Sequence, residues 1–139
     1  MKITDVTVTL WEWKDIPPIQ YTRAATATGT RTVQMGLLKI HTDEGIEGIS
    51  FLGSSFGSAA QDGPFVVKSV KPTLVGQDPF ERERIWQSNM QRLRYKLNIV
   101  CAVDVALWDL AGKAANLPIH KLLGSFRNKV PAYASSAVL

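Results

Sequence analysis

The sequence predicts an α+β domain, in which a three-stranded antiparallel meander is followed by a helical bundle. Two patterns support this fold class. Apolar and polar residues alternate through most of the first 52 residues, and the turn sequence Asp43-Glu44-Gly45 interrupts that alternation as the loop of a hairpin would. Apolar residues then recur at spacings of three and four, most clearly within 99–124. At 139 residues the chain is long enough for one domain with an ordinary core.

The opening strand is predicted over residues 2–13, which are rich in Thr and Val. Alternation places Val6, Val8 and Leu10 on one face and Ile3, Thr7, Thr9 and Trp11 on the other. Residues 14–31 are rich in Ala, Thr and Pro and show neither period, so we expect a long loop there.

The hairpin consists of a second strand over Thr32–Thr42 and a third over Ile46–Leu52. We expect Lys39, His41 and Glu47 on its solvated face, and we interpret His41 as a surface residue rather than a ligand. The small polar stretch 53–63 follows. It lacks the glycine spacings of phosphate-binding loops, so it predicts a flexible loop.

Two helices are predicted next. Pro64 opens a short one that Pro72 should distort and Gly76 should end. Asp78-Pro79 is a typical helix start, with the acid as N-cap and proline at the first helical position. The apolar side chains of this second helix are expected to pack against the helix that follows; they are Trp86, Met90, Leu93 and Leu97.

The stretch 99–124 is the most apolar part of the chain, and it predicts a helix buried on more than one side and stopped before Pro118. Cys101, the single cysteine, is expected to be a small core residue. Asp109 and Lys113 are four residues apart in the order that favours a helical ion pair.

Asp104 falls in the middle of the apolar face of this helix. A carboxylate there must be paired or hydrogen-bonded, because an isolated buried charge is too costly. We interpret it as a structural acid satisfied by backbone amides or an arginine. The alternative is a catalytic acid or metal ligand, but no second acid on the same face supports that role.

Composition excludes several function classes. The formal charge is +4, but the basic residues are scattered, which argues against nucleic-acid binding. No apolar run is long enough to cross a membrane, and one cysteine allows no disulfide within the chain. The N-terminus lacks the apolar core of a signal peptide, so we expect a cytoplasmic protein.

The segment AVDVALWDLAGKAANLPIHKLLG, followed by VPAYAS, resembles the end of the N-terminal capping domain in the mandelate racemase/muconate lactonizing enzyme branch of the enolase superfamily. The resemblance extends to the opening strand, the HTDEGIEG hairpin and the helical region. It implies an enolase-type capping domain over residues 1–124. Residues 125–139 would then be a linker and the first strand of a truncated (β/α) barrel, because a whole barrel needs roughly 250 residues.

The resemblance also implies an activity. Full-length relatives remove the proton α to a carboxylate, using lysine or histidine bases, and stabilise the product on Mg²⁺. Their metal ligands and bases lie on the barrel, so we assign no catalytic and no metal-binding residue to this chain. We expect an acid-sugar dehydratase, or else a racemase or cycloisomerase. The expected partners are a small carboxylate substrate, the missing barrel domain and further copies of the chain.

In the family, two loops of the capping domain close over the substrate, and they correspond here to 14–31 and 53–62. Tyr21 and Arg23 are our candidates for contacting hydroxyl or carboxylate groups. Arg23 could equally be a solvated loop residue. Phe51, Leu52 and Phe56 could supply an apolar wall. The segment GISFL departs from the common family form, so substrate identity cannot be carried over from any one relative.

A second reading is a stand-alone α+β interaction module that kept the capping fold without an enzyme. Such a module would be a well-folded monomer or dimer with no need of a barrel. If the chain folds alone, we expect another copy of it to cover the apolar surface meant for the barrel.

Overall fold

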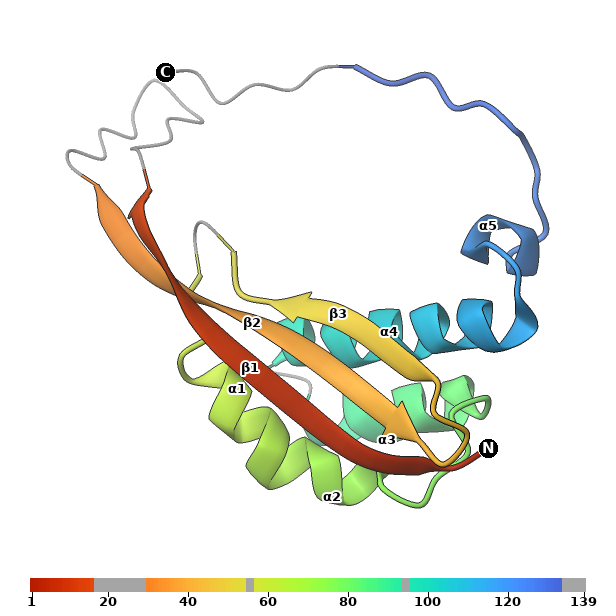
Figure 1. Ribbon diagram of the computed structural model, residues 1–139, viewed down its shortest axis with the longest axis horizontal. Helices are drawn as coiled ribbons and strands as arrows, with labels where there is room; N and C mark the ends of the chain where they lie inside the picture. Colours follow the sequence, from red (N-terminus) through yellow and green to blue (C-terminus); the bar gives the residue numbers. More distant parts are fainter. Residues whose placement is uncertain (17–29, 55–56, 94–95, 134–139) are drawn as a thin grey trace.

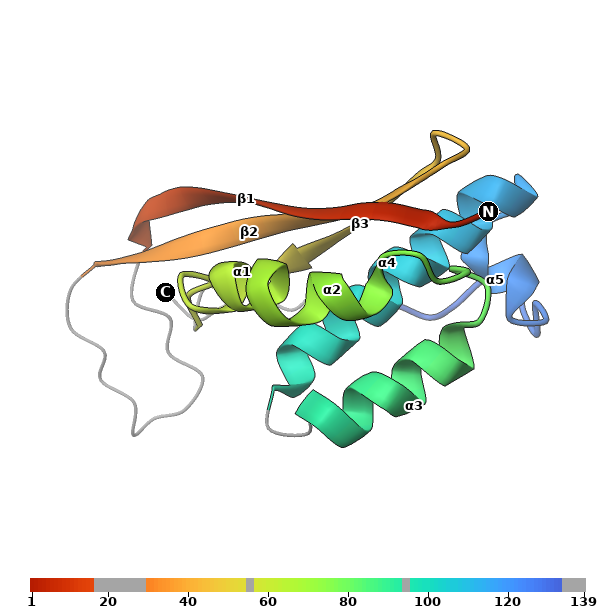
Figure 2. The ribbon, with the colours of Figure 1, turned by 90° about the horizontal axis from the view of Figure 1, so that it is seen from below.

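The computed structural model describes residues 1–16, 30–54, 57–93 and 96–133. Three strands form an antiparallel sheet in the order β1-β2-β3, with β1 at Ile3–Ile16, β2 at Arg31–Thr42 and β3 at Glu47–Leu52. The helices cover one face of this sheet (Figures 1 and 2). They are α1 Asp62–Phe65, the π-helical turn η1 Val66–Val70, α2 Lys71–Leu74, α3 Arg82–Leu93, α4 Leu97–Ala115 and α5 Ile119–Leu122. The predicted fold class is confirmed.

β1 is longer than predicted and contains an irregularity near its start. Its pairing with β2 shifts register between Ile3 and Asp5, which brings Ile3 to the same buried face as Val6. The prediction that Ile3 lies on the opposite face is therefore wrong. At the other end, Ile16 pairs with Arg31 and is buried, so β1 extends three residues beyond the predicted end at residue 13.

Residues 62–74 form one helical rod from α1, η1 and α2, beginning two residues before Pro64. The π-helical turn ends at Val70, two residues before Pro72. Proline lacks an N–H, and its ring clashes with the carbonyl of the preceding turn, so an ordinary helical turn is excluded there. The distortion expected from Pro72 is thus present. Gly63 allows the rod to approach β1 closely, since a Cβ there would lie 3.0 Å from the Leu10 side chain.

α3 begins at Arg82, three residues after Pro79. The Asp78 carboxylate accepts a hydrogen bond from the Phe80 N–H at 2.9 Å, so it closes a turn before the helix instead of capping the helix itself.

The predicted apolar side of α3 is displaced by one position. Ile85 and Asn89 are the buried residues, whereas Trp86 is half-buried and Leu97 belongs to α4 and is 51% exposed. Leu93 packs against the core, and the side chain of Met90 lies outside the described residues.

α4 passes beneath β3 and supplies much of the core. A Cβ on Gly48 of β3 would lie 2.1 Å from the Ala106 carbonyl oxygen, so strand and helix touch backbone to backbone. Ser50 of β3 donates a hydrogen bond to the Ala102 carbonyl at 2.6 Å. α4 ends at Ala115, because Asn116 adopts the left-handed conformation.

One side of α4 has no partner within the described part of the chain. Leu97 and Val105 are 51% and 54% exposed, and Cys101 between them is exposed as well. The expectation that Cys101 is a core residue is wrong, because β3 and α3 cover only part of the helix circumference. Among the described residues, no helix is both long and apolar enough to cross a membrane.

Candidate functional site

The sheet face turned away from the helices carries an exposed aromatic group near one end. Trp11 and Trp13 of β1 are 41% and 44% exposed, and Phe51 of β3 is 63% exposed. The rings of Trp11 and Phe51 meet edge to face with centroids 6.2 Å apart. At this end of the sheet β1 ends at Ile16, β2 begins at Arg31 and β3 ends at Leu52. We call these three side chains the aromatic patch.

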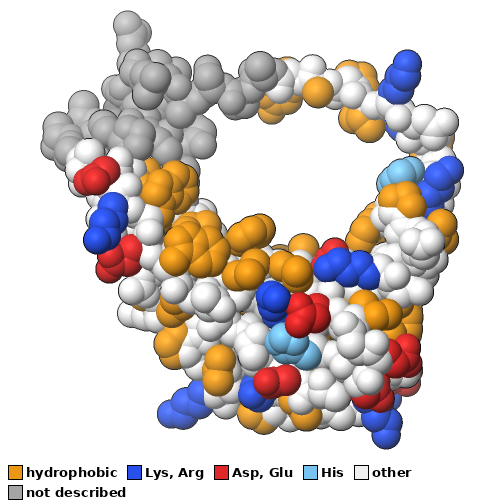
Figure 3. Space-filling view, viewed as in Figure 1, with side chains coloured by type: hydrophobic (Ala, Val, Ile, Leu, Met, Phe, Trp, Pro, Cys, Tyr) orange, Lys and Arg blue, Asp and Glu red, His pale blue; other side chains and the backbone are white. Residues whose placement is uncertain are grey.

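Hydrophobic side chains also follow the opening between the sheet and the C-terminal segment (Figure 3). That segment leaves α5 and passes along the far side of the opening (Figure 1). Its large apolar side chains are 65–89% exposed; they are Leu123, Phe126, Val130 and Tyr133. Large exposed apolar patches are rare on soluble monomers, so the aromatic patch and this segment each have the character of an interface.

The strand expected over 129–139 is not formed in its described part, since residues 129–133 have no strand structure. A strand needs a neighbour to satisfy its backbone hydrogen bonds, and the described residues place none beside this segment. Residues 134–139 lie outside the described part of the chain.

The five predicted substrate-contacting residues fall into three groups. Tyr21, Arg23 and Phe56 lie outside the described residues. Phe51 belongs to the aromatic patch and could form an apolar wall. Leu52 is 2% exposed and packs in the core, because adjacent strand residues point to opposite faces. Leu52 therefore does not line the predicted apolar wall.

The other half of the same sheet face is polar and pairs within itself. The His41 ring lies between Thr7 Oγ1 at 2.9 Å and Glu47 Oε1 at 2.8 Å, and Lys39 Nζ lies 2.9 Å from Glu47 Oε2. The Lys39 hydrogen bond is the main reason why the pKa of Glu47 lies below its usual range. These residues satisfy one another on the solvated face, as the sequence indicates.

The predicted ion pair on α4 is present and has a function that the sequence did not reveal. Asp109 Oδ2 accepts a hydrogen bond from Lys113 Nζ at 2.6 Å and another from the Ile49 N–H at 2.8 Å. Lys113 Nζ also donates to the Glu47 carbonyl at 2.9 Å. Because β3 is an edge strand, this pair satisfies backbone groups that would otherwise lack a partner. It fixes the strand from which Phe51 projects.

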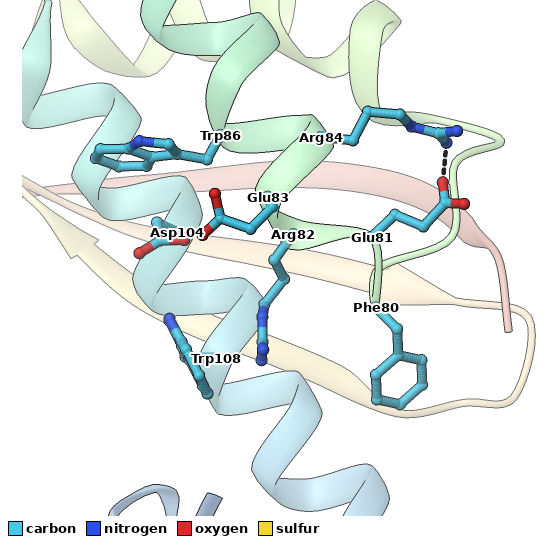
Figure 4. A pocket seen from close by; sticks show the side chains of 8 residues that line it. All are labelled: Phe80, Glu81, Arg82, Glu83, Arg84, Trp86, Asp104 and Trp108. Atoms are coloured by element: carbon cyan, nitrogen blue, oxygen red, sulfur yellow. Dashed lines mark ion pairs between the residues drawn. The ribbon is translucent and has the colours of Figure 1, made fainter. Parts of the chain in front are cut away.

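Asp104 lies at the edge of the apolar face and not at its centre. Its half-buried carboxylate faces a pocket between α3 and α4 (Figure 4). Burial raises the pKa of Asp104, Glu83 adds to the rise, and the positive charge of Arg82 opposes it. Among the described residues Asp104 has no hydrogen bond or ion pair, so the pairing that the structural interpretation expects is not formed, and Arg82 acts on it only through its charge.

The described residues include no cluster of three His, Cys, Asp or Glu side chains able to hold a metal ion.

The geometry defines a small α+β domain whose own core is complete and whose outer aromatic surface has no partner within the described residues. The sequence model of the mandelate racemase / muconate lactonizing enzyme N-terminal domain matches residues 3–124. The chain belongs to this family.

Curated relatives include acid-sugar dehydratases. The chain is 38% identical over 114 residues to a D-galactonate dehydratase family member from Marinomonas sp., covering 73% of this chain and 27% of the relative. It is 36% identical over 98 residues to D-mannonate dehydratase from Novosphingobium aromaticivorans, covering 63% of this chain and 23% of that enzyme. The chain thus spans about a quarter of the length of these relatives.

Solved structures show the same fold. D-glucarate dehydratase from Agrobacterium tumefaciens, complexed with magnesium, matches 96% of this chain with a TM-score of 0.69 at 32% identity, over 35% of its own chain. An enolase-superfamily member from Polaromonas sp. JS666 matches 100% of this chain with a TM-score of 0.80 at 25% identity, over 37% of its own chain.

Proposed function

We propose that this chain is the substrate-capping part of a Mg²⁺-dependent enolase-superfamily enzyme that removes the α-proton of a carboxylate. The favoured reaction is dehydration of an acid sugar, since similar proteins are named D-galactonate, D-mannonate and D-glucarate dehydratases. Racemase and cycloisomerase activities are the alternatives within the family. The observation that carries the proposal is the aromatic patch, which stands unpartnered at the end of the sheet where both candidate capping loops begin.

The chemistry explains why two parts are needed. An α-proton beside a carboxylate is weakly acidic, and a bound Mg²⁺ would offset the second negative charge that develops when that proton leaves. The groups that hold the metal and move the proton would lie on a barrel joined to this domain. This chain would exclude water and select the substrate, with Phe51 as an apolar wall and with Tyr21 and Arg23 contacting polar groups.

A chimera tests the proposal. Residues 1–124 would replace the matching domain of D-mannonate dehydratase from Novosphingobium aromaticivorans, and dehydration of D-mannonate, D-galactonate and D-glucarate would be assayed with Mg²⁺. We expect a folded chimera that dehydrates at least one of these acid sugars. A chimera that folds as stably as the parent enzyme but acts on none of them would contradict the proposal.

Substitutions in the active chimera test the loop residues. We expect Arg23→Met to lower kcat/KM roughly tenfold to a hundredfold, the range expected for one charge-assisted hydrogen bond. The matched control is Lys14→Met, which removes an exposed positive charge near the same end of the sheet. If both substitutions had the same effect, Arg23 would be a solvated residue.

A second candidate is a stand-alone interaction module that associates with further copies through the aromatic patch. It is favoured by one observation: the core on the helical side of the sheet is already closed by residues of this chain. Analytical ultracentrifugation of the 139-residue chain distinguishes the two. A stable dimer that Phe51→Ser and Trp11→Ser convert to a monomer supports the module. Aggregation or poorly cooperative unfolding argues against a stand-alone module.

A further inference from the structure

A pocket of about 280 Å³ lies between the start of α3 and the middle of α4, apart from the aromatic patch (Figure 4). Its walls include two half-buried indoles, Trp86 of α3 and Trp108 of α4, and Asp104 lies one helical turn before Trp108. The remaining lining residues are Phe80, Glu81, Arg82, Glu83 and Arg84.

The charges in this pocket are unbalanced. Three carboxylates face two guanidinium groups, so the lining carries one net negative charge on a chain whose formal charge is +4. Arg84 is paired with Glu81. The excess negative charge therefore lies around Asp104 and Glu83, with Arg82 as their nearby cation.

The aromatic walls suit a cation as well. The face of an indole attracts positive charge more strongly than the other aromatic side chains do. The guanidinium carbon of Arg82 lies 3.4 Å from the centroid of the Trp108 ring, so one planar cation is already bound in this way. Trp86 offers a second indole on the other side of Asp104 (Figure 4).

We propose that this pocket binds an organic cation, an ammonium or guanidinium group, between Trp86, Asp104 and Trp108. A divalent metal fits the pocket less well, because such ions need several converging oxygen ligands. The cation could belong to a small molecule or to an arginine side chain of another polypeptide. The inference does not depend on the proposed enzymatic function.

The four tryptophans of the chain provide a test with an internal control. In the 139-residue chain labelled with 5-fluorotryptophan, ¹⁹F NMR resolves each indole. Titration uses tetramethylammonium chloride, with sodium chloride at equal ionic strength as the reference. We expect saturable shifts at Trp86 and Trp108 and none at Trp11 and Trp13. Shifts at all four, or none at any, would overturn the proposal.

Two variants with opposite expected effects on affinity distinguish a change in the pocket from a loss of folding. Asp104→Asn keeps the side-chain shape and is expected to weaken binding roughly tenfold. Arg82→Ala removes the resident cation, so it is expected to tighten binding, which unfolding cannot imitate. Glu12→Gln removes an exposed charge on β1 and should change nothing. Equal affinity in Asp104→Asn and the parent chain would refute the site.

A second titration identifies the source of the cation. N-acetyl-arginine amide imitates an arginine side chain of a polypeptide. If it binds more tightly than tetramethylammonium, the pocket is a protein contact; the reverse order indicates a small ammonium ligand. If neither probe saturates the pocket, both assignments of the cation are wrong.

Discussion

The two faces of the sheet differ in what completes them. On the inner face, Val6, Leu38 and Ile40 are at most 1% exposed, sealed by helices of the same chain. On the outer face, Trp11 and Phe51 are 41% and 63% exposed. The inner face therefore explains why the chain folds, whereas the described residues leave the aromatic patch on the outer face uncovered.

The largest expected contrast compares one apolar side chain from each face. Leu38→Ala leaves a cavity in a closed core and should lower the free energy of unfolding by about 3 kcal/mol. Phe51→Ala removes an exposed side chain and should change it by less than about 0.5 kcal/mol. Urea unfolding of both variants measures the difference. Equal losses would show that the aromatic patch is part of the folding core.

Gly48→Ala tests how closely the inner face is packed. The new methyl group would collide with the Ala106 carbonyl, and neither backbone can yield easily, so we expect a loss of about 2 to 3 kcal/mol. Gly57→Ala is the control, because the nearest atom to a Cβ there is 3.8 Å away. Thermal unfolding compares the two. A stable Gly48→Ala variant would mean that α4 can move away from β3.

The Asp109 contact with the edge strand β3 has a smaller expected effect. Asp109→Asn weakens the hydrogen bonds to the Ile49 N–H and Lys113, at a cost of about 1 kcal/mol. Glu81→Gln removes an exposed partner of Arg84 and should cost less than about 0.5 kcal/mol. Hydrogen exchange at Ile49 should accelerate only in the Asp109 variant. Unchanged exchange there would argue against the edge contact.

The smallest effect is a pH dependence from the polar half of the outer face. The pKa of Glu47 lies below its ordinary value of 4.5, so the paired carboxylate stabilises the fold above pH 4.5, and that stability is lost as the pH falls through the lowered pKa. Glu47→Gln should therefore flatten the acid limb of stability against pH.

Asp104 should behave in the opposite way. Burial raises its pKa above 3.8, so stability from this group increases as the pH falls through that raised pKa toward 3.8. Asp104→Asn should thus stabilise the chain at pH 7 and give no gain below 3.8. Acid slopes of the same sign in the two variants would contradict these assignments.

The sequence predicted the meander, the long helix and the Asp109–Lys113 pair, because each rests on local periodicity or spacing. It missed features that depend on which surfaces meet. Cys101 and Leu97 look like core residues by spacing, yet they lie on the side of α4 that no described element covers. Ile3 changes face because of a register shift, which residue alternation cannot reveal. Leu52 and Phe51 point to opposite faces of the sheet because adjacent strand residues alternate, whereas the sequence interpretation placed both in one apolar wall.

The most direct test measures exchange of the α-proton of acid sugars with deuterium in the presence of Mg²⁺. The account predicts no exchange above background with the 139-residue chain alone and clear exchange once the D-mannonate dehydratase barrel is joined to it. Exchange by the isolated chain would contradict the claim that this domain covers a reaction whose reactive groups lie elsewhere.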